Sequence, residues 1–416
     1  MFCKEAFFQE TKVGSIPKDW EVAELGDSAI AEIILGQSPP SSTYNSEGNG
    51  LPFLQGKMEF GNIYPSPTSF CSEPTKIAEP NDILLSVRAP VGAVNIAQDR
   101  YCIGRGLSAI RAKKEKLSHL FLFYYLCSAE RRFSSLSMGS TFKAIRKDEI
   151  ERFSMPLPRI PEQKGIGEVL SCVDLAIQKT DEVIAKTERL KKGLMQKLLT
   201  EGIGHKEFKD TEIGTIPRTW QAITYGKVTN RITYGFTNPM PHVDKGHHII
   251  TAKNIIDGEI DYSSADVTSD EAYLRSLTGK SRPQRGDVLL SKDGTIGRSA
   301  VVDRDGLCIS QSVALLIPKR DLIQPAFLSL SLESPTTQKL IQLHSATTTI
   351  PHLSITKVAK MRFGLPQIIE QDKIVEVISS VDRKLQLEKK QGGILRRVKS
   401  GLMDLLLTGR VRVRVD

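Results

Sequence analysis

The sequence lacks the features that mark a secreted, disulfide-bonded or membrane-spanning protein. Its six cysteines stand singly, without the paired spacing of a metal site or a disulfide framework. No apolar run approaches the roughly 20 residues that cross a bilayer. The first residues, MFCKEAFFQE, contain no basic stretch followed by an apolar one, so we expect no secretion signal. These absences predict a cytoplasmic chain with reduced thiols.

Recognisable catalytic motifs are also missing. The sequence contains no glycine-rich dinucleotide motif, no phosphate-binding loop, no zinc-protease motif and no nucleophile elbow. No methyltransferase or nuclease motif is recognisable either. The neighbouring His247 and His248 would point to opposite sides of a strand, which is poor geometry for a shared metal. We therefore expect a protein that binds rather than one that catalyses.

The charge is unevenly balanced. The chain has 57 Lys and Arg against 48 Asp and Glu, a formal net charge of +9. Such an excess favours a polyanionic partner, because Lys and Arg neutralise phosphates and release counterions. The alternative is a basic surface that serves solubility alone.

The sequence is written twice. Its two tryptophans, Trp20 and Trp220, close the related phrases VGSIPKDW and IGTIPRTW. Further matches follow in the same order, roughly 200 to 208 residues apart: NDILLSVRAPVG with GDVLLSKDGTIG, LPRIPEQKGIGEVLSCVD with LPQIIEQDKIVEVISSVD, and GLMQKLLTEGI with GLMDLLLTGRV. Repeats of this length are whole domains rather than solenoid units. The order and near-constant offset indicate a duplication of a domain and its connector.

Each connector has the pattern of a long helix. From residue 161 to 200, apolar or small residues recur at alternating steps of four and three, with Lys191 as an exception whose stem can lie along the stripe. The second connector repeats the frame, but Gly392 and Gly393 predict a weak point or kink. A single apolar stripe needs cover, so we expect the two helices to pack antiparallel. The alternative is that each helix packs on its own domain.

The regions between the connectors contain short strand-like runs broken by Gly, Pro and Asn, with a few short helices. They predict an α+β fold with two similar globular domains, joined by two long, antiparallel, coiled-coil-like helices. We place the first domain at residues 1–158 and its helix at 159–204. We place the second domain at 205–366 and its helix at 367–416.

Candidate DNA contacts lie in the loops of the two domains. Arg88 and Lys292 each follow a buried-looking strand in the repeated phrase, and the alternative for both is a solvated cation beside a β-turn. Side chains that can reach bases or phosphates include cations, amides and hydroxyls. The candidates are Lys57, Arg88, Arg105, Lys143, Lys253, Lys292, Gln311 and Thr348, with Gln55, Asn62 and Asn254 as further candidate base readers.

These repeated phrases together resemble the specificity subunit of Type I restriction–modification systems. The motifs are the twofold T-x-[VI]-G-x-I-P-x-x-W, the strand-loops LLSVRAPVG and LLSKDGTIG, the EQ helix start and the LM-x-x-LLT helix end. The resemblance runs from about Thr11 to Val413. It implies that each globular unit is a target recognition domain for one half of a bipartite DNA site, with the helices setting the gap.

The resemblance also implies a division of labour. The chain would perform no chemistry and hold no cofactor. It would bind double-stranded DNA, and a membrane would not be among its partners. It would recruit modification subunits, which use S-adenosylmethionine to methylate adenine, and restriction subunits, which use ATP and magnesium to translocate and cut. Two alternatives stay open from the residues alone. One is an enzyme with a hidden methyltransferase or nuclease site, and the other is a coiled-coil adaptor that binds only proteins.

Overall fold

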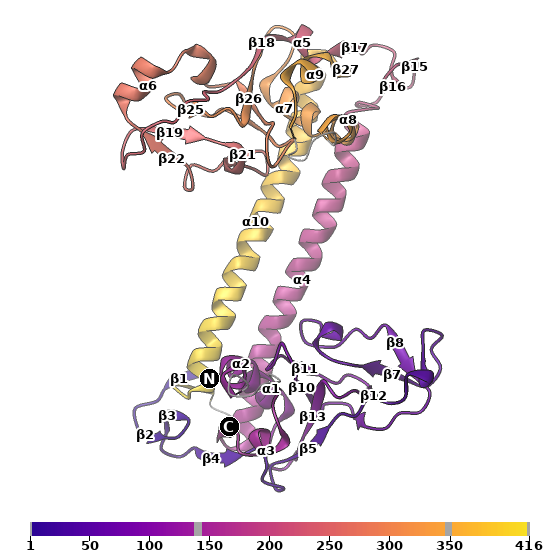
Figure 1. The fold of residues 1–416 in the computed structure, drawn as a ribbon, viewed down its shortest axis with the longest axis vertical. Helices are drawn as coiled ribbons and strands as arrows, with labels where there is room; N and C mark the ends of the chain where they lie inside the picture. Colours follow the sequence, from indigo (N-terminus) through magenta and orange to yellow (C-terminus); the bar gives the residue numbers. More distant parts are fainter. Residues whose placement is uncertain (1, 137–143, 346–351, 414–416) are drawn as a thin grey trace. The chain divides into compact units, whose positions relative to one another are not determined.

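The computed structural model describes residues 2–136, 144–345 and 352–413. The chain forms two compact units (Figure 1). Unit 1 consists of residues 1–181 and 390–416, and unit 2 of residues 182–389. Helices α4 (Ile160–Leu198) and α10 (Ile368–Leu407) each contribute residues to both units. Among the described residues, no helix is both long and apolar enough to cross a membrane.

The centre of unit 1 is an antiparallel sheet with the strand order β11–β10–β13–β5. The runs ILLS and VNI are buried throughout, as expected for strands in the interior. A second sheet, in which β12 runs parallel to β7, has the order β6–β8–β7–β12–β9. The bounds are β5 Ala31–Leu35, β6 Tyr44–Asn45, β7 Leu51–Leu54, β8 Ser69–Cys71, β9 Ile77–Ala78, β10 Ile83–Ser86, β11 Val94–Ile96, β12 Tyr101–Ile103 and β13 Leu107–Ala112.

Unit 2 repeats this plan. Its sheet β24–β23–β26–β18 has the order and pairing of β11–β10–β13–β5, and β25 runs parallel to β19 as β12 does to β7. The shared topology confirms the predicted duplication and the α+β class. The bounds are β18 Thr229–Tyr234, β19 His247–Ile250, β20 Ile255–Ile256, β21 Glu259–Ile260, β22 Asp266–Thr268, β23 Val288–Ser291, β24 Ser299–Val301, β25 Cys308–Ile309 and β26 Val313–Pro318.

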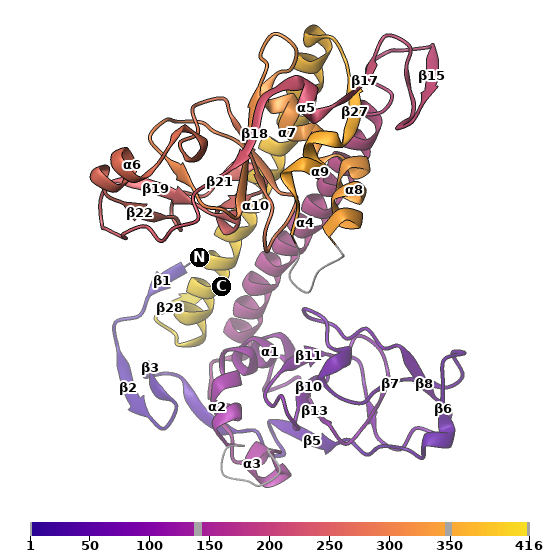
Figure 2. The same ribbon diagram turned by 45° about the horizontal axis from the view of Figure 1, so that its top comes forward.

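Short helices follow the sheets in both units, as the sequence predicts. Helices α1 and α7 occupy equivalent places and pack against β11 and β24 respectively. Figure 2 shows α1 beside β11. In both helices Phe and Leu side chains are buried. The bounds are α1 His119–Ser128, α2 Glu130–Leu136, α3 Lys147–Glu151, α5 Tyr225–Val228, α6 Asp270–Ser276, α7 Pro325–Glu333, α8 Pro335–Ser345 and α9 Ile355–Lys360.

The repeated tryptophan phrase forms a hairpin that is tied to a helix start. Trp20 and Trp220 are 2% and 0% exposed. The indole Nε1 of Trp20 donates to Glu162 Oε2 at 3.2 Å, and that of Trp220 donates to Glu370 Oε2 at 3.0 Å. The glutamate of each EQ pair thus accepts a hydrogen bond from a buried tryptophan. The strands are β2 Phe8–Thr11, β3 Gly14–Pro17, β4 Glu21–Glu24 and β14 Ser154–Leu157, with β15 Phe208–Thr211, β16 Gly214–Pro217, β17 Gln221–Thr224 and β27 Arg362–Leu365 in unit 2.

The glutamine of each EQ pair fixes the short helix to the long one. Gln163 Oε1 accepts from the backbone N of Ser118 at 2.8 Å, just before α1. Gln371 Oε1 accepts from the backbone N of Gln324 at 2.8 Å, just before α7. Both amide groups also donate to two backbone carbonyls, and both residues are 0% exposed. Because a buried amide must find partners, these bonds make the junction specific.

Ion pairs hold the two long helices antiparallel within each unit. In unit 1, Asp174 pairs with Lys399 at 2.6 Å and Asp181 with Arg396 at 2.5 Å. In unit 2, Glu188 pairs with Lys389 at 3.1 Å and Lys191 with Asp382 at 2.6 Å. As the residue numbers of the partners on α4 increase, those of the partners on α10 decrease, so the two helices are antiparallel in each unit. The expected pairing is therefore confirmed in each unit.

The apolar stripe of α4 meets α10 as the heptad-like spacing predicts. Ile166 and Leu170 are 0% exposed and belong to the core of unit 1, together with Leu406. Leu198 belongs to the core of unit 2, together with Ile374. Lys191, the exception in the stripe, is partly exposed, and its Nζ binds Asp382 Oδ1 at 2.6 Å.

Helix α10 runs without a break from Ile368 to Leu407, through Gly392 and Gly393, and the weak point or kink expected there stays a prediction. Glycine in a helix interior costs only about 1 kcal/mol relative to alanine, which neighbouring contacts outweigh. At the other connector, Gly202 and Gly204 follow α4 with φ of +67° and +74°, as a helix stop requires. The division at residues 158, 204 and 366 stays a prediction.

Strand β28 (Val411–Val413) pairs with β1 (Phe2–Lys4), which brings the two ends of the chain together in unit 1. The middle residue of β28, Arg412, is 16% exposed in its side chain and binds three acids. Its guanidinium contacts Glu162 at 2.6 Å, Glu5 at 2.6 Å and Asp19 at 2.9 Å. Sequence alternation predicts an edge strand here, but not this cluster. In unit 2, His205 takes the corresponding place, 2.8 Å from Glu370.

Candidate nucleic-acid interface

The loops that carry Lys57, Arg88 and Arg105 meet at one edge of unit 1. The turn at Arg105 lies between the other two, since the backbone N of Gly104 donates to Leu54 O at 2.8 Å and that of Val87 donates to Gly106 O at 2.9 Å. The approach is so close that a Cβ on Gly106 would lie 2.4 Å from Gln55 O. Glycine at this position permits the convergence.

All three cations are exposed. Lys57 Nζ lies 3.7 Å from Glu130 Oε1, and the backbone N of Arg105 donates to Ser38 Oγ at 3.2 Å. Arg88 forms an isolated backbone bridge with Ala144. Candidate Lys143 precedes Ala144 and lies outside the described residues. Lys57, Arg88 and Arg105 thus lie exposed on converging loops, which is the arrangement a DNA contact needs.

In unit 2 the equivalent loops converge on Ser312. The backbone N of Ala252, beside Lys253, donates to Ser312 Oγ at 3.1 Å, and the backbone N of Lys292 donates to Ser312 O at 2.9 Å. Gln311 precedes Ser312 and is exposed, like Lys253. Lys253 lies 3.8 Å from Asp266. Candidate Thr348 lies outside the described residues. As DNA contacts, all eight candidates stay predictions.

Arg88 and Lys292 both follow buried strands, but they do not occupy equivalent positions in the two units. Ser86 pairs with Leu107, and Ser291 pairs with Val313, so the residue after each serine is Val87 in unit 1 and Lys292 in unit 2. Both are buried, at 5% and 6% exposure. Arg88 corresponds instead to Asp293, and each forms a backbone bridge to the segment before α3 or α9. Lys292 is therefore no solvated cation beside a turn.

The proposal of Asn254 as a base reader is also contradicted, because this side chain is 0% exposed. Its Oδ1 accepts from the backbone N and the hydroxyl of Thr251, at 2.9 Å and 2.7 Å. Its Nδ2 donates to Ser264 Oγ at 3.1 Å. The amide oxygen is thus used within its own turn, and the amide nitrogen is held by Ser264. Gln55 and Asn62, by contrast, are exposed.

Sequence reasoning missed a polar cluster around Lys292. Lys292 Nζ lies 2.7 Å from Asp293 Oδ2 and 5.3 Å from the centre of the Tyr234 ring. His352 Nδ1 lies 2.5 Å from Asp293 Oδ1. The signal was present in the sequence, since a gap-free alignment of SVRAPVG with SKDGTIG already pairs Arg88 with Asp293. The histidine comes from a distant segment and no local pattern indicates it.

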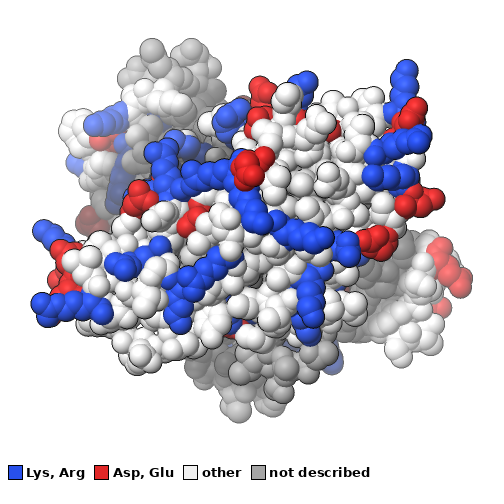
Figure 3. All heavy atoms as spheres, turned by 90° about the horizontal axis from the view of Figure 1, so that it is seen from above, with Lys and Arg blue, Asp and Glu red and all other residues white. Residues whose placement is uncertain are grey.

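Figure 3 shows one face of unit 2, the end that carries α5 and β27 in Figure 1. Lys and Arg side chains cross this face, and fewer Asp and Glu lie between them. A surface of this sign attracts phosphates over distances of about 8 Å at physiological salt.

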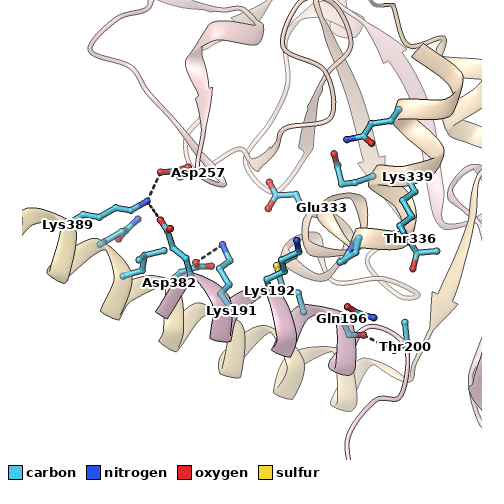
Figure 4. A pocket seen from close by; sticks show the side chains of 17 residues that line it. Lys191, Lys192, Gln196, Thr200, Asp257, Glu333, Thr336, Lys339, Asp382 and Lys389 are labelled. Atoms are coloured by element: carbon cyan, nitrogen blue, oxygen red, sulfur yellow. Dashed lines mark hydrogen bonds and ion pairs between the residues drawn. The ribbon is translucent and has the colours of Figure 1, made fainter. Parts of the chain in front are cut away.

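A cavity of about 740 Å³ in unit 2 has a different character (Figure 4). Its lining comes from α4, α10, the α7–α8 corner and the β20–β21 turn, and the cations and acids in it are similar in number. Most are already paired, as in Lys191 with Asp382 and Lys389 with Glu188 and Asp257. A lining of balanced sign does not favour a polyanion. We therefore place the candidate interface at the loops and not in this cavity.

The carboxyl of Glu333, which lines this cavity, is expected to make the stability of the protein depend on pH. Burial raises the pKa of its carboxyl, with opposing hydrogen bonds from Ser299. The folded state then keeps a proton that the unfolded state releases, so this group lowers stability as pH rises above about 4.5, by at most about 1.4 kcal/mol per pH unit. We expect Glu333→Gln to raise the unfolding temperature more at pH 8 than at pH 5. Equal shifts at both pH values would contradict this, and thermal unfolding across that range measures it.

Comparison with known proteins identifies the family. The model of the Type I restriction modification DNA specificity domain matches residues 17–189 and 241–393, which together exceed half of the chain. The chain belongs to this family. The two matched segments correspond to the two copies of the duplication, and each includes one of the converging loop clusters described above.

Two named type I specificity subunits are similar over nearly the whole chain, and a third over about half of it. The MjaVIII type I specificity subunit of Methanocaldococcus jannaschii is 26% identical over 423 residues, covering 99% of this chain and 98% of the relative. A second protein of that organism, provisionally named the MjaX type I specificity subunit, is 48% identical over 204 residues, or 48% of each chain. The EcoBI specificity subunit of Escherichia coli is 23% identical over 94% of this chain and 85% of its own length.

A solved structure shares the fold. The crystal structure of the S subunit of a Type I restriction–modification system from M. genitalium has a TM-score of 0.61, at 16% identity, over 93% of this chain and 96% of that chain. A second, from work on complex assembly of a type I R-M system, has a TM-score of 0.55, covering 95% of this chain and 99% of its own.

Proposed function

We propose that this chain is the sequence-specific DNA-binding subunit of a Type I restriction–modification complex. Each unit contributes one target recognition domain, and each domain reads one half of a bipartite DNA site. The observation that carries the proposal is the repeated loop cluster: the same three loops converge in both units and present Lys57, Arg88 and Arg105 in one and Lys253 and Gln311 in the other. Family membership and the net charge of +9 support it.

The helices set the gap between the two half-sites in this proposal. A continuous helix of 39 residues is about 58 Å long at 1.5 Å per residue. Two such helices with paired charges resist bending better than one. Two linked domains bind one duplex more tightly than either alone, because the second contact is effectively intramolecular. A fixed separation then selects sites with one gap length.

The subunit itself is non-catalytic in this proposal. Modification subunits that use S-adenosylmethionine and restriction subunits that use ATP and magnesium supply the chemistry, and they assemble on this chain. We place the complex in the cytoplasm, where cellular DNA is its substrate. The sequence motifs that we sought for such chemistry are missing, which is consistent with this division of labour.

The proposal predicts that helix length determines the gap. A heptad is inserted into each helix by duplicating Glu182–Glu188 in α4 and Arg383–Lys389 in α10, which preserves the stripe and the Glu188–Lys389 pair. The insertion adds about 10 Å, or roughly three base pairs at 3.4 Å each. We expect the two half-sites to stay the same and the preferred gap to lengthen by one to three base pairs. Site selection from random DNA, with the methyltransferase complex, measures both.

Insertion into α4 alone is the control. It breaks the register of the helix pair, so we expect weaker binding and no defined new gap. An unchanged gap in the double insertion would refute the ruler. The absence of salt-dependent binding to any bipartite sequence by the unaltered complex would refute the proposed function itself. Mapping methylated adenines in host DNA gives an independent reading of the site.

A further inference from the structure

Asp293 occupies a place that a cation occupies in unit 1. It corresponds to Arg88 by strand register, by the backbone bridge and by the repeated phrase. It lies next to the loops of Gln311 and Lys253, since the Ser312 carbonyl accepts from the backbone N of both Lys292 and Asp293. An acid in a cluster meant for a polyanion opposes binding unless it serves a specific contact.

The buried side chain of Lys292, next to Asp293, is not explained by stability. Lys292 is 6% exposed, and the equivalent residue in unit 1 is Val87, at 5%. A valine therefore satisfies the fold at this position. Burying an ammonium carries a desolvation penalty that a single ion pair often fails to recover, and apolar replacements are frequently neutral or stabilising. The Lys292–Asp293 pair at 2.7 Å is best explained by what it does to the carboxylate.

The carboxylate of Asp293 is oriented from two sides and still open to solvent. Lys292 binds Oδ2, and His352 Nδ1 donates to Oδ1, since an ionised carboxylate only accepts. The side chain of Asp293 stays 30% exposed. Each carboxylate oxygen can accept a second hydrogen bond, so the group retains acceptor capacity toward solvent. Two cationic or donor neighbours also reduce its repulsion of phosphates.

We propose that Asp293 reads an exocyclic amino group in the half-site of unit 2, namely N4 of cytosine in the major groove. Carboxylates accept from cytosine N4, whereas Arg reads guanine. The two units thus use the same loop position with opposite chemistry. Lys292 and His352 are positioning residues for this contact. The inference rests on the proposed function and names a base reader within it.

The experiment is site selection from random DNA with the complex carrying Asp293→Asn, compared with the unaltered complex. We expect one position in one half-site to lose its requirement for cytosine, with affinity for the original site falling about 5- to 150-fold. An amide prefers adenine, so this position should shift toward adenine. The other half-site should keep its sequence. Lys292→Met, which places an apolar side chain where unit 1 has valine, should loosen the same position while preserving the fold.

Asp321→Asn is the matched control, because Asp321 is exposed and the charge change is the same. We expect it to leave the selected sequence unchanged. Unchanged selection by both Asp293→Asn and Lys292→Met, with binding retained, would overturn the inference and leave the proposed function intact. A requirement for adenine rather than cytosine in the unaltered complex would overturn the choice of base. Failure of the unaltered complex to select any sequence would instead overturn the proposed function.

Discussion

Arg412→Met is expected to lower the free energy of unfolding of unit 1 by about 3–5 kcal/mol. Arg412 is the shared partner of Glu162, Glu5 and Asp19. Its removal leaves three carboxylates without their cation, and one of them, Glu162, is buried at 7% exposure. Leaving a buried charge unpaired costs far more than the net value of the pair. Trp20, 5.6 Å from the guanidinium, would also lose a cation–π contact.

The loss should depend on pH. A hydrogen bond from Arg412 lowers the pKa of Asp19, and hydrogen bonds from the backbone N of Phe7 and from Arg412 lower that of Glu5. For acids with lowered pKa values, the stabilisation is present above the ordinary values of 3.8 and 4.5 and is lost as pH falls through the folded values. The difference between Arg412→Met and the unaltered chain should therefore shrink as pH falls below about 4.

Arg410→Met provides the matched control, two residues away on the same strand-bearing segment. Arg410 pairs with Asp404 at 3.0 Å, but both side chains are more than 60% exposed, and such pairs contribute little. We expect a change within about 0.5 kcal/mol. Urea unfolding in a Trp220→Phe background, which leaves Trp20 to report on unit 1, measures both. Similar losses for the two variants would show that the three-acid cluster is not what stabilises this end.

Ile374→Ala is expected to cost unit 2 about 2–5 kcal/mol, because it leaves a cavity where the long helix enters the core. Ile374 is 0% exposed, in a cluster that includes Leu198 of α4 and Ile378. Because Ile374 of α10 and Leu198 of α4 belong to the same core, we expect the cavity to weaken the packing of both long helices in unit 2.

Ile369→Ala tests the same substitution on the same helix without burial, since Ile369 is 70% exposed. We expect a change within about 0.5 kcal/mol. The two variants have equal helix propensity, so any difference between them comes from packing. Fluorescence of Trp220 in a Trp20→Phe background follows unit 2 during urea unfolding. Equal losses would mean that the apolar stripe is not the source of the stability.

The repeated elements of the fold are predictable from sequence because their signals are local. The run DILLSV predicts a buried strand and IPEQKGIGEVL predicts a helix start, and β10 and α4 lie there. The sequences of the two connectors also predict that their helices pack together, because each has a long apolar stripe that must be covered. The convergence of Lys57, Arg88 and Arg105 on one edge follows from strand order, which local patterns do not contain.

The errors have physical causes as well. The sequence pattern predicts an accessible Lys292 because the residue follows a buried strand, and only the strand register shows that it takes the place of Val87. Amides can recognise adenine, which makes Asn254 a candidate reader, but its amide oxygen accepts from Thr251 within its own turn. Arg412 and His352 act through residues hundreds or tens of positions away, at Glu5 and Asp293. Sequence spacing alone does not indicate such contacts.

The ion pairs along the long helices also favour the pairing of α4 with α10 over the pairing of two copies of the same helix. Asp174 and Lys191 recur in the second copy as Asp382 and Lys399, so their pairs would form even between two copies of one helix. Asp181 and Glu188, however, recur as Lys389 and Arg396, with the signs exchanged. Two copies of α4 in this register would bring Asp181 against Glu188, and two copies of α10 would bring Lys389 against Arg396. Like charges there disfavour self-association, and the duplicated halves have become complementary to each other rather than to themselves.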